Sequence, residues 1–371
     1  MKILFLSLRN LHLPHLLPIY KWMERNLEPG FELFISSPEY APSEAERAGH
    51  GLPGEEVQRL ISEGVNWIAW ERMLSPRPDV IVMADAPFEA VAKLGTKIVN
   101  VNHGLISKGY YYSDNPIVLR ENDADLICVP GPFHRDSLKR LVHKPILVSG
   151  LVKFDRVFNG EIVRDEVLRR WGIDPKAKVV LFAPTFNLEL SSVPVVTDSV
   201  SSWIGEGEFL LIKLHGMSPP EWVEMYRLIA ELDSRIKIID DIDITPALVA
   251  ADVMVSDVSS AFMEFVALDK PVVLVNNPLR TRYIGFDPRD VEYQWRGVGI
   301  EVNRKEEVAG AVRRALDHPE ELSQKRQACA ERLAGPRDGR AAERIGQGIY
   351  DLAHKRVGGA ERFTIHSAMK V

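Results

Sequence analysis

The sequence has 371 residues and a mass of 41.8 kDa, which predicts about two domains of ordinary size. Charged residues make up 26% of the chain and hydrophobic residues 46%, values close to globular usage, so the disordered and fibrous classes are excluded. The net charge of −6 argues against a dedicated nucleic-acid-binding protein, which would show a basic footprint, and we expect no nucleic acid partner.

The two cysteines and the first residues exclude other classes. Cys128 and Cys329 lie far apart, with no ligand spacing for zinc and no disulfide framework, which fits a reducing cytosol. The apolar run at the N-terminus is short and meets Arg9 without a cleavage site, so it is not expected to be a signal peptide. No stretch approaches the length of a membrane span. We therefore expect a cytoplasmic protein.

Short apolar runs alternate with helical patterns along the whole chain. Many runs, such as VVLFA and VVLV, are continuous rather than alternating, which is typical of parallel strands covered by helices on both faces. This pattern predicts an α/β protein with two Rossmann-like, doubly wound parallel sheets. The predicted strands are 2–7, 31–36, 79–84, 97–101, 125–129, 146–148, 178–183, 208–214, 235–239, 252–256, 271–275 and 298–301, and the main predicted helices are 54–73, 163–171, 220–232, 305–316 and 339–355.

The two sets of strands are separated by a polar helix and a turn within residues 150–178. We expect an N-terminal domain at 1–160, a C-terminal domain at 161–335, and at 336–371 a helix that returns to the N-terminal domain, followed by a frayed tail. Open parallel sheets bind ligands beyond the carboxyl ends of their strands. The cleft between the domains is therefore the predicted site.

The most informative segment is 251–275, which reads strand, turn, helix, strand. Ser259 and Ser260 fall at the start of the helix, where hydroxyls, free backbone N–H groups and the helix dipole favour a phosphate. Asp257 is expected to cap the helix or to orient a neighbouring donor. Glu264 lies one turn further on, within reach of a ribose or glycerol hydroxyl. The alternative is an ordinary serine N-cap without a ligand.

A histidine–glycine pair follows a predicted strand in each half. His103 follows the strand at 97–101, and an imidazole suits general base work on a hydroxyl. Gly104 permits a close approach of substrate or backbone, and Lys108 would add positive charge for a phosphate on the acceptor side. A histidine satisfied within a loop is the alternative for His103.

His215 and Gly216 follow the strand at 208–214. Lys213 lies two residues earlier and thus on the same face of the strand as His215. If the two domains face each other, His103 and His215 approach one cleft from opposite sides. One imidazole would then act as a base and the other as a phosphate-binding cation.

Weaker candidates lie near the two ends of the chain. Arg344 is in the first turns of the last helix, where it binds a phosphate or pairs with a carboxylate. His12 follows the first strand and is expected to touch the acceptor, although a helix start at Pro14 explains the region equally well. The acidic turn at 240–243 is expected to be solvated, so we predict no metal site, no cofactor and no requirement for Mg²⁺.

Several motifs together resemble the CDP-glycerol glycerophosphotransferases of teichoic-acid assembly: HG (103–104), VPGPFHRD (129–136), VSGLVKFD (148–155), VLFAPTF (180–186), KLHG (213–216), the block from 243 to 275 and DGRAAERI (338–345). The resemblance implies the GT-B architecture. It also implies transfer of glycerol phosphate, or a related alditol phosphate, from a CDP-alditol to a hydroxyl of a glycan or lipid-linked acceptor, with release of CMP. Such enzymes act at the cytoplasmic membrane face, which implies peripheral membrane contact.

By this resemblance His103 is the proposed base and His215 contacts the donor phosphates. The remaining matched positions are the pyrophosphate-binding turn and the arginine of the last helix: Ser256, Asp257, Ser259, Ser260 and Arg344. Asn102 and Gly216 depart from the Trp and Pro that are usual there, and Glu264 replaces a common Asp.

Two alternatives remain open at this stage. One is a GT-B glycosyltransferase or epimerase that uses a UDP-, GDP- or CMP-sugar, because its C-terminal domain would bind the donor phosphates in the same way. A non-catalytic nucleotide-binding protein is the other alternative, and the two histidine–glycine pairs at strand ends argue against it.

Overall fold

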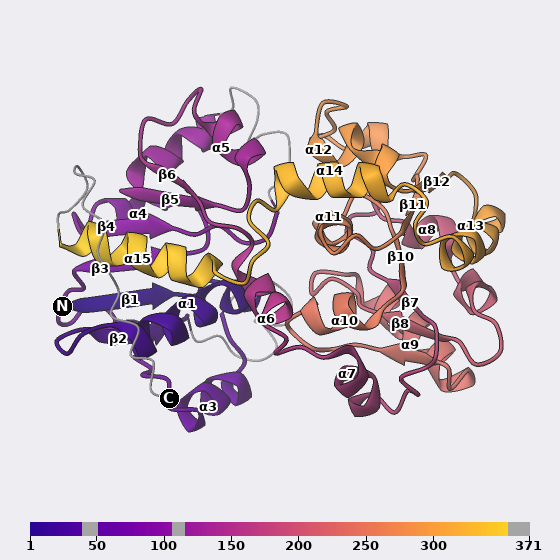
Figure 1. The fold of residues 1–371 in the computed structure, drawn as a ribbon, viewed down its shortest axis with the longest axis horizontal. Coiled ribbons are helices and arrows are strands. Elements are labelled where there is room, and N and C mark those ends of the chain that lie inside the picture. The colour runs from indigo at the N-terminus through magenta and orange to yellow at the C-terminus, as the bar shows by residue number, and fades with distance from the viewer. Residues whose placement is uncertain (39–50, 106–115, 355–371) are drawn as a thin grey trace, which may run out of the picture.

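The computed structural model describes residues 1–38, 51–105 and 116–354. The chain forms two lobes that lie side by side, each built around a six-stranded parallel sheet (Figure 1). The α/β prediction with two doubly wound sheets is confirmed.

The N-terminal sheet has the strand order β2-β1-β3-β4-β5-β6. The chain leaves β1 toward the edge strand β2 and then returns to the other side of β1 at β3, so the switch point lies between β1 and β3. The strands are β1 (Lys2–Leu6), β2 (Glu32–Ser36), β3 (Val80–Met83), β4 (Lys97–Asn100), β5 (Leu126–Val129) and β6 (Ile146–Val148).

The C-terminal sheet has the order β12-β11-β10-β7-β8-β9, and its switch point lies between β7 and β10. Neighbouring strands pair in parallel throughout, for example Val180 with Val253. The strands are β7 (Val179–Phe182), β8 (Phe209–Ile212), β9 (Ile236–Ile238), β10 (Val253–Ser256), β11 (Val272–Val275) and β12 (Ile300–Val302).

Helices cover both faces of each sheet. In the N-terminal half they are η1 (Asn10–His12), α1 (Leu13–Asn26), α3 (Gly54–Ser62), η2 (Trp70–Arg72), α4 (Glu89–Ala92), η4 (Pro116–Asp123), α5 (Pro132–Leu138), η5 (Val152–Phe154) and α6 (Asp155–Phe158). In the C-terminal half they are α7 (Arg164–Arg170), α8 (Val193–Val196), η6 (Ser199–Trp203), α9 (Pro220–Leu232), α10 (Thr245–Ala250), α11 (Ser260–Ala267), η7 (Arg280–Arg282), α12 (Val291–Gln294), η8 (Arg296–Val298), α13 (Lys305–Asp317) and α14 (Ser323–Leu333).

The continuous apolar strands are explained by burial on two sides. Along β1, Ile3 and Phe5 join the core on one face of the sheet, while Leu4 and Leu6 join the core on the other. Because neighbouring side chains alternate between faces, a strand covered by helices on both sides is apolar at every position.

The last described helix, α15 (Ala341–Ala353), returns to the N-terminal lobe and packs along α1 (Figure 1). The chain crosses between the lobes at Gly335, whose φ is +53° and where a Cβ atom would lie 2.3 Å from the carbonyl oxygen of Pro130. Only glycine fits such a crossing without a shift of the backbone. Ile345 and Ile349 of α15 are then buried in the N-terminal core.

Two predicted segments differ from the structure. The single helix predicted at 54–73 ends at Ser62, because Gly64 adopts a φ of +83° and breaks the helical path. Between β7 and β8, where the sequence analysis places no helix, the structure has the short helices α8 and η6. Across the described part of the chain, no helix combines the length and apolar character needed to cross a membrane.

Candidate functional site

Three polar side chains meet at the carboxyl edge of the N-terminal sheet. His12 follows β1, Asp85 follows β3 and His103 follows β4, and these strands are neighbours. Oδ1 of Asp85 lies 2.8 Å from Nδ1 of His103, and Oδ2 lies 3.2 Å from Nε2 of His12. The carboxylate of Asp85 therefore contacts the imidazole rings of both histidines.

The surroundings of His103 fix the position of its proton. Nδ1 lies between two acceptors, Asp85 Oδ1 and the carbonyl oxygen of Ala84 at 2.9 Å, so it carries the proton and donates. The side chain is 37% exposed, and with the proton on Nδ1 the ring nitrogen that can accept a proton is Nε2. Burial would lower the pKa of His103, but the hydrogen bond and the charge of Asp85 outweigh it and raise that pKa above its usual value. This is the arrangement of an oriented general base.

His12 lies behind this pair. Its side chain is 0% exposed and its ring stacks on that of His103, with centroids 5.1 Å apart. Burial, together with the charge of His103, lowers the pKa of His12 to about 4 despite the hydrogen bond to Asp85, so His12 is neutral at pH 7. Direct contact of His12 with an acceptor stays a prediction, and its burial favours a role in supporting Asp85 and His103.

The ligand atoms of His12, Asp85 and His103 lie within 4.8 Å of one another, a spacing that a metal ion can bridge. The proton on Nδ1 of His103 argues against this use, because a ligating nitrogen must be free of its proton. We interpret the group as a hydrogen-bonded network, and the absence of a metal stays a prediction.

At the switch point of the C-terminal sheet, Asp257 organises the turn after β10. Its buried carboxylate accepts hydrogen bonds from the N–H of Thr185 at 3.0 Å and from the N–H and hydroxyl of Ser192 at 2.6 and 2.8 Å. It also accepts from the N–H of Val258 at 2.7 Å and of Ser259 at 3.1 Å. Burial raises the pKa of Asp257 while these donors oppose the rise. The carboxylate thus holds the loops around the turn in place, and a role of Asp257 in orienting a donor to a phosphate stays a prediction.

The first turn of α11 begins at this organised loop. Ser259 is its N-cap, and its hydroxyl oxygen accepts a hydrogen bond from the N–H of Ala261. Ser259 and Ser260 are partly exposed, so the start of the helix is accessible to an anion. Ser256 is buried and donates its hydroxyl proton to the carbonyl of Ala183 at 2.6 Å, which makes it part of the supporting structure.

His215 follows β8, two strands from β10 in the same sheet and therefore about 10 Å away along the carboxyl edge. The N–H of Met217 donates to Nδ1 of His215 at 3.1 Å, so in the neutral ring Nε2 carries the proton. Burial, Lys213 and Arg9 lower the pKa of His215 to about 4. The prediction of a cationic His215 is therefore corrected: without a ligand, its ring is neutral and donates through the Nε2 N–H. The ring packs on that of Phe186, with centroids 4.6 Å apart.

Lys213 also lies at this edge and is partly buried. Burial lowers the pKa of Lys213, and the carboxylates of Asp240, Asp241 and Asp243 oppose that shift. The acidic turn after β9 therefore supports a cation in this part of the site.

The two lobes touch through Gly104 and Glu264. A Cβ atom at Gly104, whose φ is +70°, would lie 2.9 Å from Oε1 of Glu264, so glycine is needed for this approach. Oε2 of Glu264 accepts a hydrogen bond from Nζ of Lys153 at 2.5 Å, and both side chains are buried. Glu264, expected to reach a ribose or glycerol hydroxyl, thus pairs with a lysine of the N-terminal lobe in this structure.

Two other predicted residues have different outcomes. The guanidinium of Arg344 donates to the carbonyl of Ser149 at 2.9 Å and pairs with Asp338, so phosphate binding by Arg344 stays a prediction that requires it to leave these partners. Lys108 lies outside the described residues.

Sequence reasoning missed Asp85 and Lys153. Asp85 directly follows the predicted strand 79–84, so its place at a carboxyl strand end was a usable signal. Lys153 lies within the motif VSGLVKFD, but its partner Glu264 is 111 positions away, and no local pattern indicates that contact.

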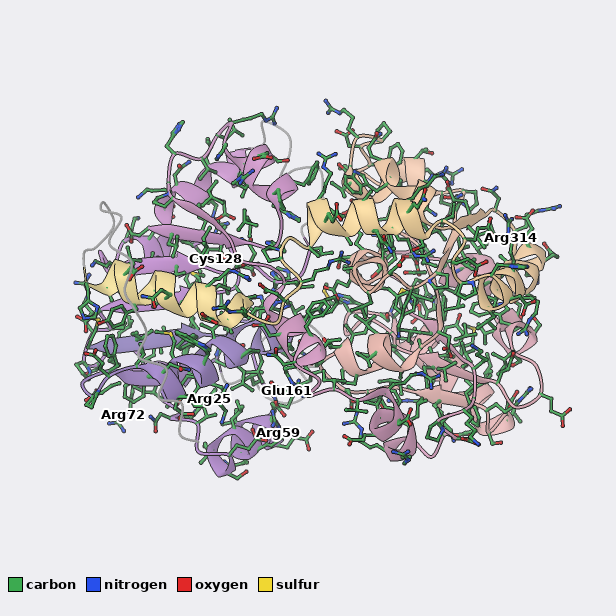
Figure 2. All side chains as sticks on the ribbon, in the orientation of Figure 1. Arg25, Arg59, Arg72, Cys128, Glu161 and Arg314 are labelled. Carbon is green, nitrogen blue, oxygen red and sulfur yellow. The ribbon has the colours of Figure 1, made fainter. Side chains whose placement is uncertain are left out.

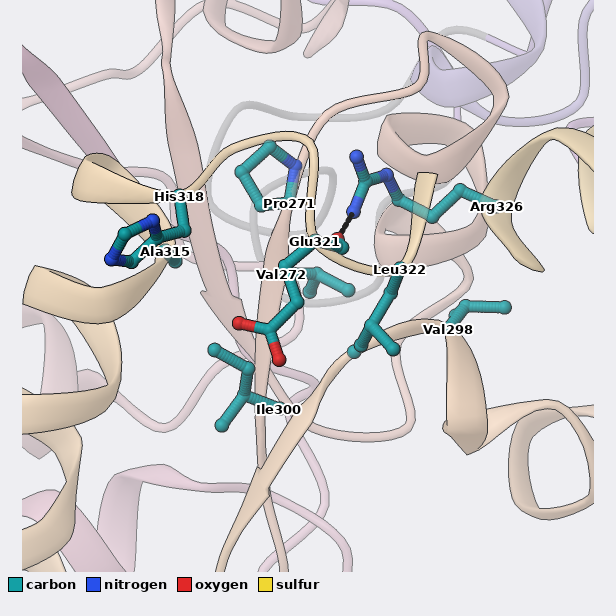
Figure 3. Close-up of a pocket in the computed structure, with 10 residues that line it drawn as sticks. Pro271, Val272, Val298, Ile300, Ala315, His318, Glu321, Leu322 and Arg326 are labelled. Carbon is teal, nitrogen blue, oxygen red and sulfur yellow. Dashed lines mark hydrogen bonds between the residues drawn. The ribbon is translucent and has the colours of Figure 1, made fainter. Parts of the chain in front are cut away.

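A small pocket in the C-terminal lobe lies away from this site. Figure 3 shows its lining, which includes Val272 and Ile300 at the starts of β11 and β12 and Arg326 of α14. Its volume is about 10 Å³, room for about one water molecule. It lies at the amino ends of the strands, whereas ligands of open α/β sheets bind at the carboxyl ends, so we do not assign it a substrate.

Solved structures with the same fold include the wall teichoic acid polymerase TagF soaked with CDPG, with a TM-score of 0.72 and 16% identity over 96% of this chain and 90% of that one. A putative UDP-N-acetylglucosamine 2-epimerase from Listeria monocytogenes matches with a TM-score of 0.62 and 17% identity over 98% and 99% of the two chains. These similarities confirm the GT-B architecture.

Among curated proteins, a teichoic acid glycerol-phosphate primase from Bacillus spizizenii (strain ATCC 23059 / NRRL B-14472 / W23) is 25% identical over 222 residues, which cover 56% of this chain and 54% of the relative. The chain therefore spans about half the length of that relative. The model of the CDP-Glycerol:Poly(glycerophosphate) glycerophosphotransferase family matches residues 70–351, which include His103, His215 and the α11 turn. The chain belongs to the CDP-glycerol:poly(glycerophosphate) glycerophosphotransferase family.

Proposed function

We propose that this protein transfers glycerol phosphate, or a related alditol phosphate, from a CDP-alditol to a hydroxyl of a glycan or lipid-linked acceptor and releases CMP. The single observation that carries the proposal is the His103–Asp85 pair, which leaves Nε2 of a 37% exposed His103 as the nitrogen able to accept a proton, within a chain of this family. Residues 1–160 would bind the acceptor and residues 161–335 the donor.

In this mechanism Nε2 of His103 takes the proton of the acceptor hydroxyl. The hydroxyl oxygen attacks the phosphorus that bears the glycerol, the bond from that phosphorus to the bridging oxygen breaks, and CMP leaves. Asp85 holds the Nδ1 proton of His103 and stabilises the imidazolium that forms.

The C-terminal lobe would bind the donor and stabilise the leaving group. The first turn of α11 at Ser259 and Ser260 offers free N–H groups to the diphosphate, His215 offers its Nε2 proton, and Lys213 adds a charged donor. Fixed donors of this kind lower a barrier because they need no reorganisation as charge develops.

The donor class is tested by measuring thermal stability with CDP-glycerol, CDP-ribitol, CMP, UDP-N-acetylglucosamine and GDP-mannose. A ligand that binds the folded state at 100 times its Kd adds about 2.7 kcal/mol, so the preferred donor should raise the melting temperature clearly. We expect the CDP-alditols to give the largest shifts. Larger shifts with UDP-N-acetylglucosamine, or no shift with any nucleotide, would reject the proposal. Mass analysis of products with glycan and lipid-linked acceptors then identifies the acceptor.

A glycosyltransferase or epimerase that uses a nucleotide-sugar is the second candidate. A UDP-N-acetylglucosamine 2-epimerase from Neisseria meningitidis, solved bound to UDP-GlcNAc, shares the fold with a TM-score of 0.62 and 12% identity over 95% of this chain and all of that one. The same panel of donors separates the two candidates.

We infer that the protein works in the cytoplasm, with peripheral contact at the inner face of the membrane, because a lipid-linked acceptor would be presented there. Its partners would be the CDP-alditol donor and this acceptor. Co-sedimentation with liposomes of anionic phospholipid tests the contact, and complete recovery of the protein in the supernatant would reject it.

Replacing Asp85 with asparagine should lower kcat/KM by about 10²-fold or more and move its pH profile. His103 acts as a base only when Nε2 is unprotonated, so activity falls as the pH drops through the pKa of His103. Asp85 raises that pKa, so the acidic limb of Asp85→Asn should lie at lower pH than that of the wild type.

Rates of transfer between pH 5 and 9 measure this shift. The matched control is Asp136→Asn, which removes an exposed carboxylate that pairs with Arg135 on the surface, and its profile should match the wild type. If the acidic limb of Asp85→Asn lies at the same pH as that of the wild type, the assignment of Asp85 as the partner of the His103 base is contradicted.

A further inference from the structure

Arg9 lies just beyond the carboxyl end of β1, a strand beside the switch point of the N-terminal sheet. Its backbone is held firmly: its carbonyl accepts hydrogen bonds from the hydroxyl of Ser7 at 3.0 Å and from the N–H of His12 at 3.1 Å. Arg9 therefore starts the same short turn that carries His12 beneath His103.

The positive charge of Arg9 acts on groups of both lobes, because it disfavours protonation of His12 and His103 in its own lobe and of His215 in the other. One cation thus interacts with both the proposed base and the proposed donor contact.

Within the described residues, the guanidinium of Arg9 has neither a hydrogen-bond acceptor nor a carboxylate within ion-pair distance, although it is partly buried. Arginines of comparable or deeper burial are paired, as the partly buried Arg164 is with Asp252 at 3.0 Å and the buried Arg296 is with Glu301 at 2.9 Å. A cation desolvated without a protein partner is costly, and an anionic ligand removes that cost.

We propose that Arg9 binds the phosphoryl group that is transferred, the phosphate distal to the nucleoside, and not the phosphate that leaves with the nucleotide. This assignment rests on the proposed function. The proximal phosphate is expected at the start of α11 in the C-terminal lobe, whereas the distal phosphorus must lie between that turn and His103. Arg9 starts the turn beneath His103 and its charge also acts on His215, so we place its guanidinium at this interval, where its planar fork matches two phosphate oxygens.

Calorimetric titration of Arg9→Ala with CDP-glycerol and with CMP tests the assignment, because CMP retains the proximal phosphate and lacks the distal one. We expect the Kd for CDP-glycerol to rise about 10-fold or more, and the Kd for CMP to stay within about 2-fold of the wild type. Arg9→Lys keeps the positive charge but loses the planar fork, so its Kd for CDP-glycerol should lie between those of the wild type and Arg9→Ala. Melting temperatures of both variants report whether they fold.

The control is Arg25→Ala on α1, an exposed arginine remote from the cleft (Figure 2), which should bind both ligands as the wild type does. An equal loss for CDP-glycerol and CMP, or no loss for either, would overturn the proposal. If the wild type instead binds UDP-N-acetylglucosamine and not CDP-glycerol, the proposed function fails, but the role of Arg9 can still be tested. Arg9→Ala should then lose affinity for UDP-N-acetylglucosamine and keep its affinity for UMP. An equal loss of affinity for both ligands, or no loss for either, would overturn the assignment of Arg9.

Discussion

His103→Ala should lower the rate of transfer by about 10³-fold or more while the Kd for the donor stays within about 2-fold. The loss follows because Nε2 of His103, the nitrogen proposed to accept the acceptor proton, is removed, and general base catalysis contributes about 10²–10⁴-fold. The donor should still bind because its expected contacts, Ser259, Ser260 and His215, lie in the other lobe.

Two measurements separate these effects. Release of CMP in the presence of acceptor gives the rate, and calorimetry without acceptor gives the donor Kd. His143→Ala is the matched control, because that histidine is exposed and lies after α5, so both quantities should be unchanged. Turnover of His103→Ala near the wild-type rate would remove the base assignment. A large loss of donor affinity would instead place His103 against the donor.

The strands were predictable because their residues meet the same environment on both faces. All twelve predicted strands are found, most of them one or two residues shorter at their ends, because apolar character extends beyond the hydrogen-bonded ladder. β12 is shifted toward the C-terminus, since residues 296–298 form a turn of 3₁₀-helix first. The helix predicted at 54–73 was wrong beyond Ser62, because its apolar spacing continues past a glycine that the backbone uses to turn.

The candidate site was partly predictable for a related reason. His103, His215 and Ser259 follow strands that were recognised, and parallel strands place their carboxyl ends along one edge. What each side chain contacts was not predictable. His12 was expected at the surface of the cleft and is buried behind His103, and Glu264 was expected to face a ligand and pairs with Lys153. The first contact depends on how the loops of one lobe pack and the second on how the two lobes pack, and residue spacing encodes neither.

The pair of Lys153 and Glu264 should be the most stability-sensitive polar contact between the lobes. Both side chains are less than 10% exposed, and the two atoms lie 2.5 Å apart. Removing one partner of a buried ion pair leaves the other charge desolvated and costs about 3–5 kcal/mol. Lys153→Met should therefore lower the free energy of unfolding by about 3 kcal/mol, as measured by urea denaturation.

Lys93→Met is the matched control, because Lys93 pairs with Glu89 in an exposed pair on α4 with side chains 73% and 79% exposed. That change should cost less than about 0.5 kcal/mol. If the two variants lose the same stability, the interlobe pair contributes no more than a surface contact. The double variant Lys153→Met with Glu264→Leu should recover much of the loss, because no buried charge remains.

The loss in Lys153→Met should also depend on pH. Burial raises the pKa of Glu264 and Lys153 opposes the rise, so removing the lysine raises that pKa further. A carboxyl group with a higher pKa in the folded state binds more protons folded than unfolded, so its contribution to stability falls as the pH rises above the unfolded value. Lys153→Met should thus lie closer to the wild type at pH 5 than at pH 8. A difference that stays constant between these pH values would show that Glu264 is not left as a buried charge.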